Sequence, residues 1–63
     1  MDSKRLKYID VIVAGKNDNY EVSAVKHCSS PLYVNIAKAI LVERLSRSFP
    51  ELSFHINVVR VYE

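Results

Sequence analysis

The sequence predicts one small α+β domain with the element order β-β-α-β, and three observations predict it. Apolar and polar residues alternate in two stretches that flank a segment rich in turn-forming residues. A Ser-Pro pair then precedes a long segment whose apolar residues have helical spacing. Alternation returns in residues 52–62 of the 63-residue chain. We therefore expect a three-stranded, mostly antiparallel sheet with one helix packed on one face.

The first two predicted strands form a hairpin. Residues 6–14 alternate, and their β-branched side chains favour a packed strand. One face of this strand carries Ile9, Val11 and Val13. The sequence GKNDN at 15–19 is typical of a hairpin loop, because Gly, Asn and Asp tolerate positive φ angles. Residues 20–27 alternate again, so we expect one face of this strand to contact water. We expect the polar residues 1–5 to be flexible.

The predicted helix covers residues 31–48. Ser30 is a favourable N-cap, and Pro31 suits the first helical position because its missing N–H would have no partner there. Pro50 disfavours a helical conformation at Phe49, so the helix should end before that residue.

The third predicted strand covers residues 52–62. Its first apolar side chains alternate at Leu52, Phe54, Ile56 and Val58. After Val58 the apolar pattern shifts to Val59 and Val61. Either a β-bulge lies at Val58 and Val59 or both faces of the strand are covered there.

The order of the three strands follows from short connections and from crossover handedness. The helix crosses one face of the sheet, and the third strand then lies antiparallel beside the first. This gives the strand order 2-1-3 and makes the third strand an edge. The alternative is the order 1-2-3 with one parallel pair.

The predicted helix has more apolar surface than one face of a sheet needs. On a helical wheel, the stripe that can pack on the sheet comprises Tyr33, Val34, Ala37, Ile40, Leu41 and Leu45. A second apolar group lies on another side, and its members are Leu32, Ile36 and Ala39. A few exposed aliphatic residues are normal on a monomer, but apolar surface beyond one face also marks interfaces.

These features predict a noncatalytic protein-interaction module. A free apolar edge strand is a template for pairing, and a domain this small gains stability from added burial. We expect a homodimer with a continuous six-stranded sheet, or a partner protein that adds a strand to the same edge. The predicted interface comprises Leu32, Ile36, Ala39, Phe54, Ile56, Val58, Val59, Val61 and Tyr62.

No catalytic, metal or cofactor site is predicted. The chain has one cysteine, Cys28, so it cannot form an internal disulfide. His27 and Cys28 are adjacent, but a zinc site needs about four ligands and the only other histidine is His55. We expect Cys28 to be a half-buried structural thiol and not a reactive one, and no carboxylate pair or glycine-rich phosphate loop is evident.

Composition favours a soluble, cytoplasmic protein. The start MDSKRLKYID is charged and lacks the apolar run of a signal peptide. No stretch approaches the roughly 20 apolar residues that a membrane span needs. A single unpaired thiol fits a reducing compartment.

The alternative function is a small nucleic-acid-binding module. Its basic residues would be Lys4, Arg5, Lys7, Arg44 and Arg47. Tyr8, Tyr20 and Tyr62 could stack bases on the sheet face opposite the helix. However, the net charge is only +2, and arginines near a helix C-terminus also complement the helix dipole.

In its size, its order of elements and its lack of a catalytic set, the chain resembles the very small α/β proteins encoded by phages and other mobile elements. Several of those proteins bind and inhibit a host protein such as RNA polymerase or a defence nuclease. The resemblance therefore implies an inhibitor that acts by protein binding, and it assigns no role to any particular residue.

Overall fold

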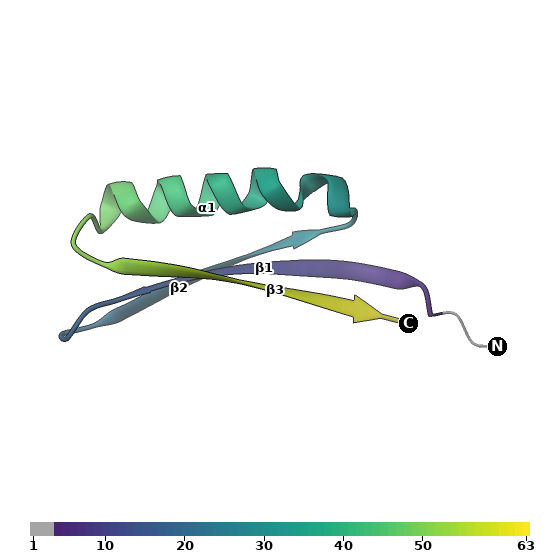
Figure 1. Cartoon of the computed structure of the whole chain (residues 1–63), viewed down its shortest axis with the longest axis horizontal. Coiled ribbons are helices and arrows are strands. Elements are labelled where there is room, and N and C mark those ends of the chain that lie inside the picture. Colours follow the sequence, from purple (N-terminus) through teal and green to yellow (C-terminus); the bar gives the residue numbers. More distant parts are fainter. Residues whose placement is uncertain (1–3) are drawn as a thin grey trace.

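In the computed structural model, which describes residues 4–63, three antiparallel strands form one sheet with a helix on one face (Figure 1). The elements are β1 (Leu6–Lys16), β2 (Glu21–Cys28), a 3₁₀ turn η1 (Pro31–Tyr33), α1 (Val34–Ser48) and β3 (Ser53–Tyr62). The strand order is β2-β1-β3, and β1 pairs antiparallel with both neighbours. The predicted fold class and strand order are therefore confirmed.

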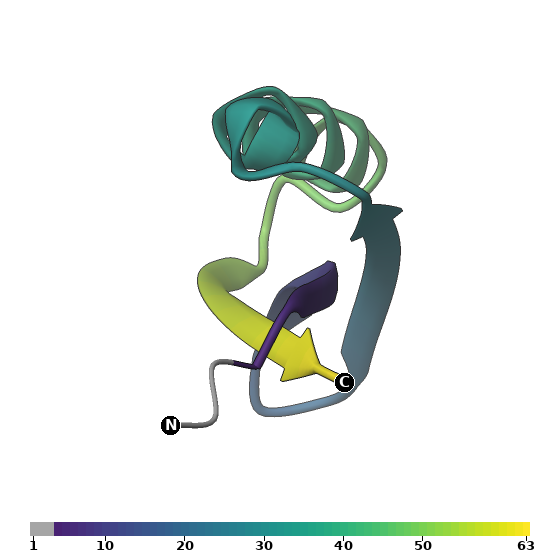
Figure 2. The ribbon, with the colours of Figure 1, turned by 90° about the vertical axis from the view of Figure 1, so that its right-hand side faces the viewer.

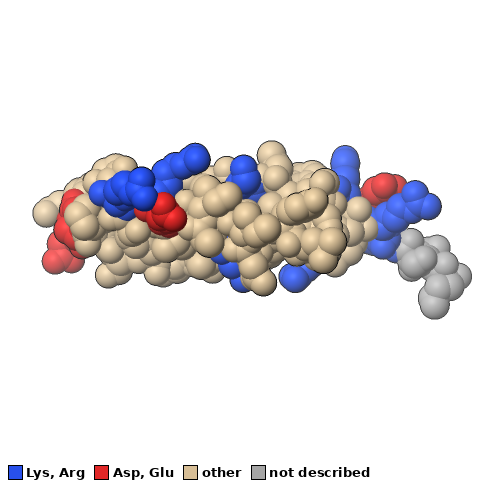
Figure 3. All heavy atoms as spheres, turned by 90° about the horizontal axis from the view of Figure 1, so that it is seen from above, with Lys and Arg blue, Asp and Glu red and all other residues tan. Residues whose placement is uncertain are grey.

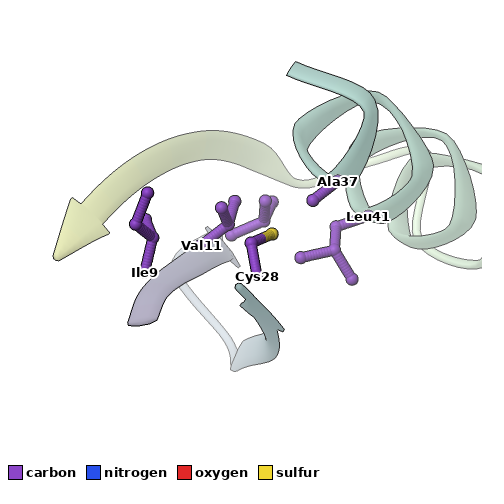
Figure 4. Close-up of a cluster of buried hydrophobic side chains, with 6 residues drawn as sticks. Ile9, Val11, Cys28, Ala37 and Leu41 are labelled. Carbon is purple, nitrogen blue, oxygen red and sulfur yellow. The ribbon is translucent and has the colours of Figure 1, made fainter. Parts of the chain in front are cut away.

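The core lies between α1 and the helix-facing side of β1. Ile9, Val11 and Val13 are fully buried, as the alternation in β1 predicts. The side chains of Ala37 and Leu41 come down from α1 onto this row, and Cys28 joins it from the end of β2 (Figure 4). The core is apolar, since no polar or charged side chain among residues 4–63 is buried.

A β-bulge lies at the start of β1 and not at Val58 and Val59, where the sequence pattern allowed one. The register along β3 is continuous at those valines, and it shifts between Leu6 and Tyr8. The extra residue, Lys7, turns Leu6 back to the helix-facing side, where it packs against the core. The apolar shift in β3 therefore means that Val58 faces the helix and Val59 faces the opposite side of the sheet.

Gly15 belongs to β1 and not to the hairpin loop, which corrects the interpretation of GKNDN. The strands stay paired up to Lys16 and Glu21, and no residue in the described part of the chain has a positive φ angle. Asn17 closes the loop instead, because its Oδ1 accepts hydrogen bonds from the N–H groups of Asn19 (2.8 Å) and Tyr20 (3.0 Å).

The helical segment begins at the predicted cap. The Ser30 side chain accepts a hydrogen bond from the Leu32 N–H at 3.2 Å, and Pro31 occupies the first position of η1. α1 then runs to Ser48, and the N–H of Phe49 donates to the Leu45 carbonyl at 2.8 Å. The predicted segment therefore exists, but its first turn is 3₁₀.

The molecule is thin and elongated, and it consists of two layers, the sheet and the helix. Its principal extents are 48 × 21 × 11 Å. The end-on view shows α1 above the sheet, with β2 and β3 at opposite edges (Figure 2). α1 packs mainly against β1 and β2 and touches β3 least.

We expected residues 1–5 to be flexible. Residues 1–3 lie outside the described residues. Arg5 is held in place by a backbone hydrogen bond, because its carbonyl accepts from the Glu63 N–H at 2.9 Å.

Candidate interaction surfaces

The edge of β3 carries an uncovered apolar row on its helix-facing side. Phe54, Ile56 and Val58 lie opposite Gly15, Val13 and Val11 of β1, and they are followed on this side by Arg60 and Tyr62. Because α1 lies mainly over β1 and β2, the Ile56 side chain remains 44% exposed. We call the helix-facing side chains and free backbone groups of residues 54–62 the β3 edge.

The free backbone groups of the β3 edge belong to its even-numbered residues. The Glu63 N–H points at β1, because it donates to the Arg5 carbonyl. Backbone groups of successive strand residues point to alternate sides, so the N–H and C=O groups of Phe54 and every second residue after it point away from β1. No proline and no register shift interrupts this row along β3. It is therefore an open template for a further strand.

The opposite edge of the sheet is less suited to strand addition. β2 has 8 residues against 10 in β3. Lys26 lies directly opposite Val11, between Ala24 and Cys28 in the helix-facing row of β2. A charged side chain at such a position is a common protection of an edge strand, because an added strand would have to desolvate it. β3 also carries one such side chain, Arg60 opposite Ile9, but it lies nearer the strand end and follows three apolar residues of the row. The two edges therefore differ in the length of their apolar row.

The outer side of the helical segment that η1 and α1 form together is a second exposed apolar surface. Leu32 is 82% exposed and Ile36 is 55% exposed, and Ala39 is exposed beside them. Uncharged atoms make up most of the middle of the helix-side face (Figure 3).

Two residues of the predicted sheet-facing stripe of the helix are exposed and do not belong to the buried core. Tyr33 is 56% exposed, and Ile40 is also exposed. The helix is rotated so that Ala37 and Leu41 point at the sheet, and Ile40 lies about 100° around the axis from Leu41. The exposed surface is consequently larger than the sequence predicted. We call Leu32, Tyr33, Ile36, Ala39 and Ile40 the outer helix surface.

The remaining predicted interface residues lie on the open face of the sheet, which is the side away from α1. Val59 pairs with Asp10 and Val61 pairs with Tyr8, so both valines point to that side. Val25 of β2 lies there too and is 53% exposed. The alternation of residues 20–27 predicts that Val25 lies with Glu21 and Ser23 on one face of the strand, and it does not mark Val25 as part of an interface.

The open face also holds the only histidine–carboxylate contact among residues 4–63. Asp10 and His27 are directly opposite each other, and His27 Nδ1 contacts Asp10 Oδ1. The ring of Tyr8 packs edge-on against His27, with 5.1 Å between ring centroids. The hollow that the described residues form on α1 is lined by none of these three residues. We therefore interpret it as a cross-strand packing contact.

His27 and Cys28 cannot act together. They are consecutive strand residues, so His27 points to the open face while the Cys28 thiol is buried in the core. The nearest polar partner of Cys28 Sγ is the Tyr33 carbonyl oxygen at 4.0 Å, which would not stabilise a thiolate. Within residues 4–63 no group of three or more His, Cys, Asp or Glu side chains could hold a metal ion.

A hollow of about 230 Å³ lies on α1 and is lined by Ile40, Glu43, Arg44 and Arg47. Arg47 Nη2 is 2.6 Å from Glu43 Oε1, one helical turn away. All of the lining residues come from one helix, so no second element closes the hollow around a ligand. It is a surface depression and does not indicate a substrate site.

The residues of the nucleic-acid alternative do not come together. Arg44 and Arg47 lie near the C-terminal end of α1, whereas Lys4, Arg5 and Lys7 lie at the start of β1, at the opposite end of the molecule (Figure 1).

The three tyrosines of that alternative do not form one platform either. Tyr8 is on the open face, but Tyr62 pairs with Leu6 on the helix-facing side. Tyr20 lies at the hairpin loop, where its ring packs on Phe49 and its hydroxyl hydrogen-bonds to Glu51.

Comparison with protein-family models, curated proteins and solved structures finds no match to this chain. Within the described residues, the helical segments lack the length and apolar character that a membrane crossing requires.

Proposed function

We propose that this protein is a noncatalytic protein-interaction module that self-associates through the β3 edge and binds a partner protein. The observation that carries the proposal is the difference between the two edges of the sheet. On β3, Phe54, Ile56 and Val58 form a continuous apolar row with Ile56 44% exposed, and the one charged side chain of that row, Arg60, follows them towards the end of the strand. On β2, Lys26 lies opposite the buried Val11, after only Val22 and Ala24. Strand addition at β3 would bury this row and satisfy the free backbone groups beside it.

The second part of the proposal concerns the partner. The outer helix surface points away from the sheet and stays exposed when a strand is added at β3. We propose that it binds a partner protein and, in keeping with the resemblance to phage-encoded α/β proteins, inhibits it. The single unpaired cysteine fits a cytoplasmic setting for this activity.

Sedimentation equilibrium or light scattering tests the self-association. The native chain should be dimeric at high micromolar concentration. Ile56→Lys should shift it to monomer, because the lysine would have to be desolvated inside the new strand pair. The matched control is Val25→Lys, which replaces a similarly exposed β-branched residue on the other edge strand and should leave the dimer intact. A native chain that stays monomeric, with Ile56→Lys sedimenting identically, contradicts the proposal.

Affinity capture with matched helix variants tests the partner. A protein that binds the native chain through the outer helix surface should be lost with Ile36→Glu. It should be retained with Asn35→Glu, which places the same charge on a neighbouring exposed polar position. Equal retention by both variants would exclude this surface as the binding site.

A further inference from the structure

The free backbone groups of β3 restrict how a second copy can pair with it. A new antiparallel strand forms hydrogen bonds only to residues whose N–H and C=O groups point outward. On β3 these are the even-numbered residues from Phe54 to Tyr62. When the partner is an identical strand, each outward residue must lie opposite another outward residue, so only a few registers are possible.

One register uses every outward residue. If the two-fold axis passes through Val58, then Val58 lies opposite itself. Ile56 then lies opposite Arg60 of the second copy, and Phe54 lies opposite Tyr62 of the second copy. Moving the axis to Asn57 or Val59 leaves an outward residue unpaired at one end of each strand. The register centred on Val58 therefore forms the largest number of backbone hydrogen bonds.

The side chains in this register are mutually compatible. Phe54 and Tyr62 form an aromatic cross-strand pair on the helix-facing side, and the aliphatic stem of Arg60 covers the exposed Ile56. The two copies of Arg60 lie roughly 13 Å apart along the strands, so like charges do not meet. On the open face, Val59 lies opposite Asn57 and Val61 lies opposite His55 of the second copy.

The side-chain match in this register is the reason to choose a second copy as the occupant, and the twist of the sheet is compatible with it. The strands cross visibly in Figure 1, so the β3 edge is twisted. An identical strand has the same twist and can follow this edge along its whole length. We infer that two copies pair through β3 with the two-fold axis at Val58, giving a six-stranded sheet with both α1 helices on one face. This inference rests on the proposed self-association.

Cysteine cross-linking tests the register in a Cys28→Ala background, which removes the native thiol. Single variants Val58→Cys, Asn57→Cys and Val59→Cys are oxidised mildly, and covalent dimer is followed over time. Only residues at the two-fold axis meet their own copy within the Cα separation that a disulfide allows, so Val58→Cys should cross-link about tenfold faster than either neighbour.

The outcomes separate the two claims. Fastest cross-linking of Asn57→Cys or Val59→Cys would move the axis and overturn the register, while a dimeric mass of the uncross-linked protein would still support self-association. A monomeric mass for the native chain and slow cross-linking of all three variants would overturn both. Circular dichroism of each reduced variant checks that it is folded.

Discussion

At the scale of single residues, the contact between Gly15 and Phe54 shows how a strand position depends on its neighbour across the sheet. The two residues are paired directly, and the Phe54 ring lies over the glycine. A Cβ atom built on Gly15 would lie 2.4 Å from Phe54 Cε1, which is closer than atoms can approach. The glycine is therefore needed for close approach of the ring and not for a turn.

We expect Gly15→Ala to lower the free energy of unfolding by about 1–3 kcal/mol, because the ring must move out of its packed position. This effect should exceed the roughly 0.5–1 kcal/mol that alanine gains over glycine in a strand. Urea denaturation measures it. In a Phe54→Ala background the same substitution should be neutral or stabilising. A stabilising effect of Gly15→Ala in the native background would show that the ring is free to move.

This glycine also shows what the sequence can and cannot reveal at the residue scale. GKNDN is rich in turn-forming residues, and the loop is indeed adjacent, but the loop is closed by the Asn17 side chain. A glycine can be required either by a turn or by an aromatic ring that packs over it, and in the second case the ring belongs to a residue far away in the chain. No local pattern contains that information.

At the scale of elements, the start of the helix is specified locally and was predictable from the sequence. Ser30 provides the side-chain acceptor and Pro31 the preset φ angle, and both occupy the positions that the dipeptide predicts. The orientation of the helix about its axis was not predictable in the same way. Tyr33 and Ile40 are as apolar as the residues that pack, and only the shape of the core decides which of them contact the sheet.

We expect Ser30→Ala to cost about 1 kcal/mol of unfolding free energy, because the Leu32 N–H loses its acceptor. Thermal or urea unfolding followed by circular dichroism measures this loss. Ser29→Ala is the matched control, since the structure shows no hydrogen bond from the Ser29 side chain, and it should change stability by less than about 0.5 kcal/mol. Equal losses in the two variants would show that the cap is not the stabilising contact.

The exposed and buried sides of α1 should respond differently to substitution. Ile36→Glu should leave the unfolding free energy of the monomer within about 0.5 kcal/mol of the native value, because Ile36 is 55% exposed. Leu41→Ala should cost about 2–5 kcal/mol, because Leu41 is buried against β1. Urea denaturation of both variants and the native chain, at a protein concentration low enough to keep them monomeric, measures these unfolding free energies. A large loss with Ile36→Glu there would mean that this side chain contributes to the core.

At the scale of the whole molecule, the surface is too large for a compact monomer. The accessible area is 4844 Å², whereas a compact monomer of this mass exposes about 4100 Å². The radius of gyration is 13.8 Å, against about 11 Å for a compact chain of this length. The elongated shape follows from three long strands covered by a single helix.

The sequence predicted the order of the strands because short connections and handedness leave few topologies for three strands and one helix. It did not predict the difference between the edges in the length of their apolar row. Lys26 protects β2 only because the register places it opposite the buried Val11. The alternation of β2 puts Lys26 on the same face as Val22 and Ala24, but it does not give the residue that lies opposite it, so this half of the candidate site required the structure.

Self-association should make the thermal stability depend on protein concentration, because only the folded chain can form the β3 pair. A 100-fold increase in concentration favours a folded dimer by about 2.7 kcal/mol, or about half of that per chain. For a domain of this size, that should raise Tm by roughly 5–10 °C. Differential scanning calorimetry of the native chain across this range measures the shift. Ile56→Lys should abolish the dependence, and Val25→Lys should retain it. A native Tm that stays constant across the range would contradict a dimer linked to folding.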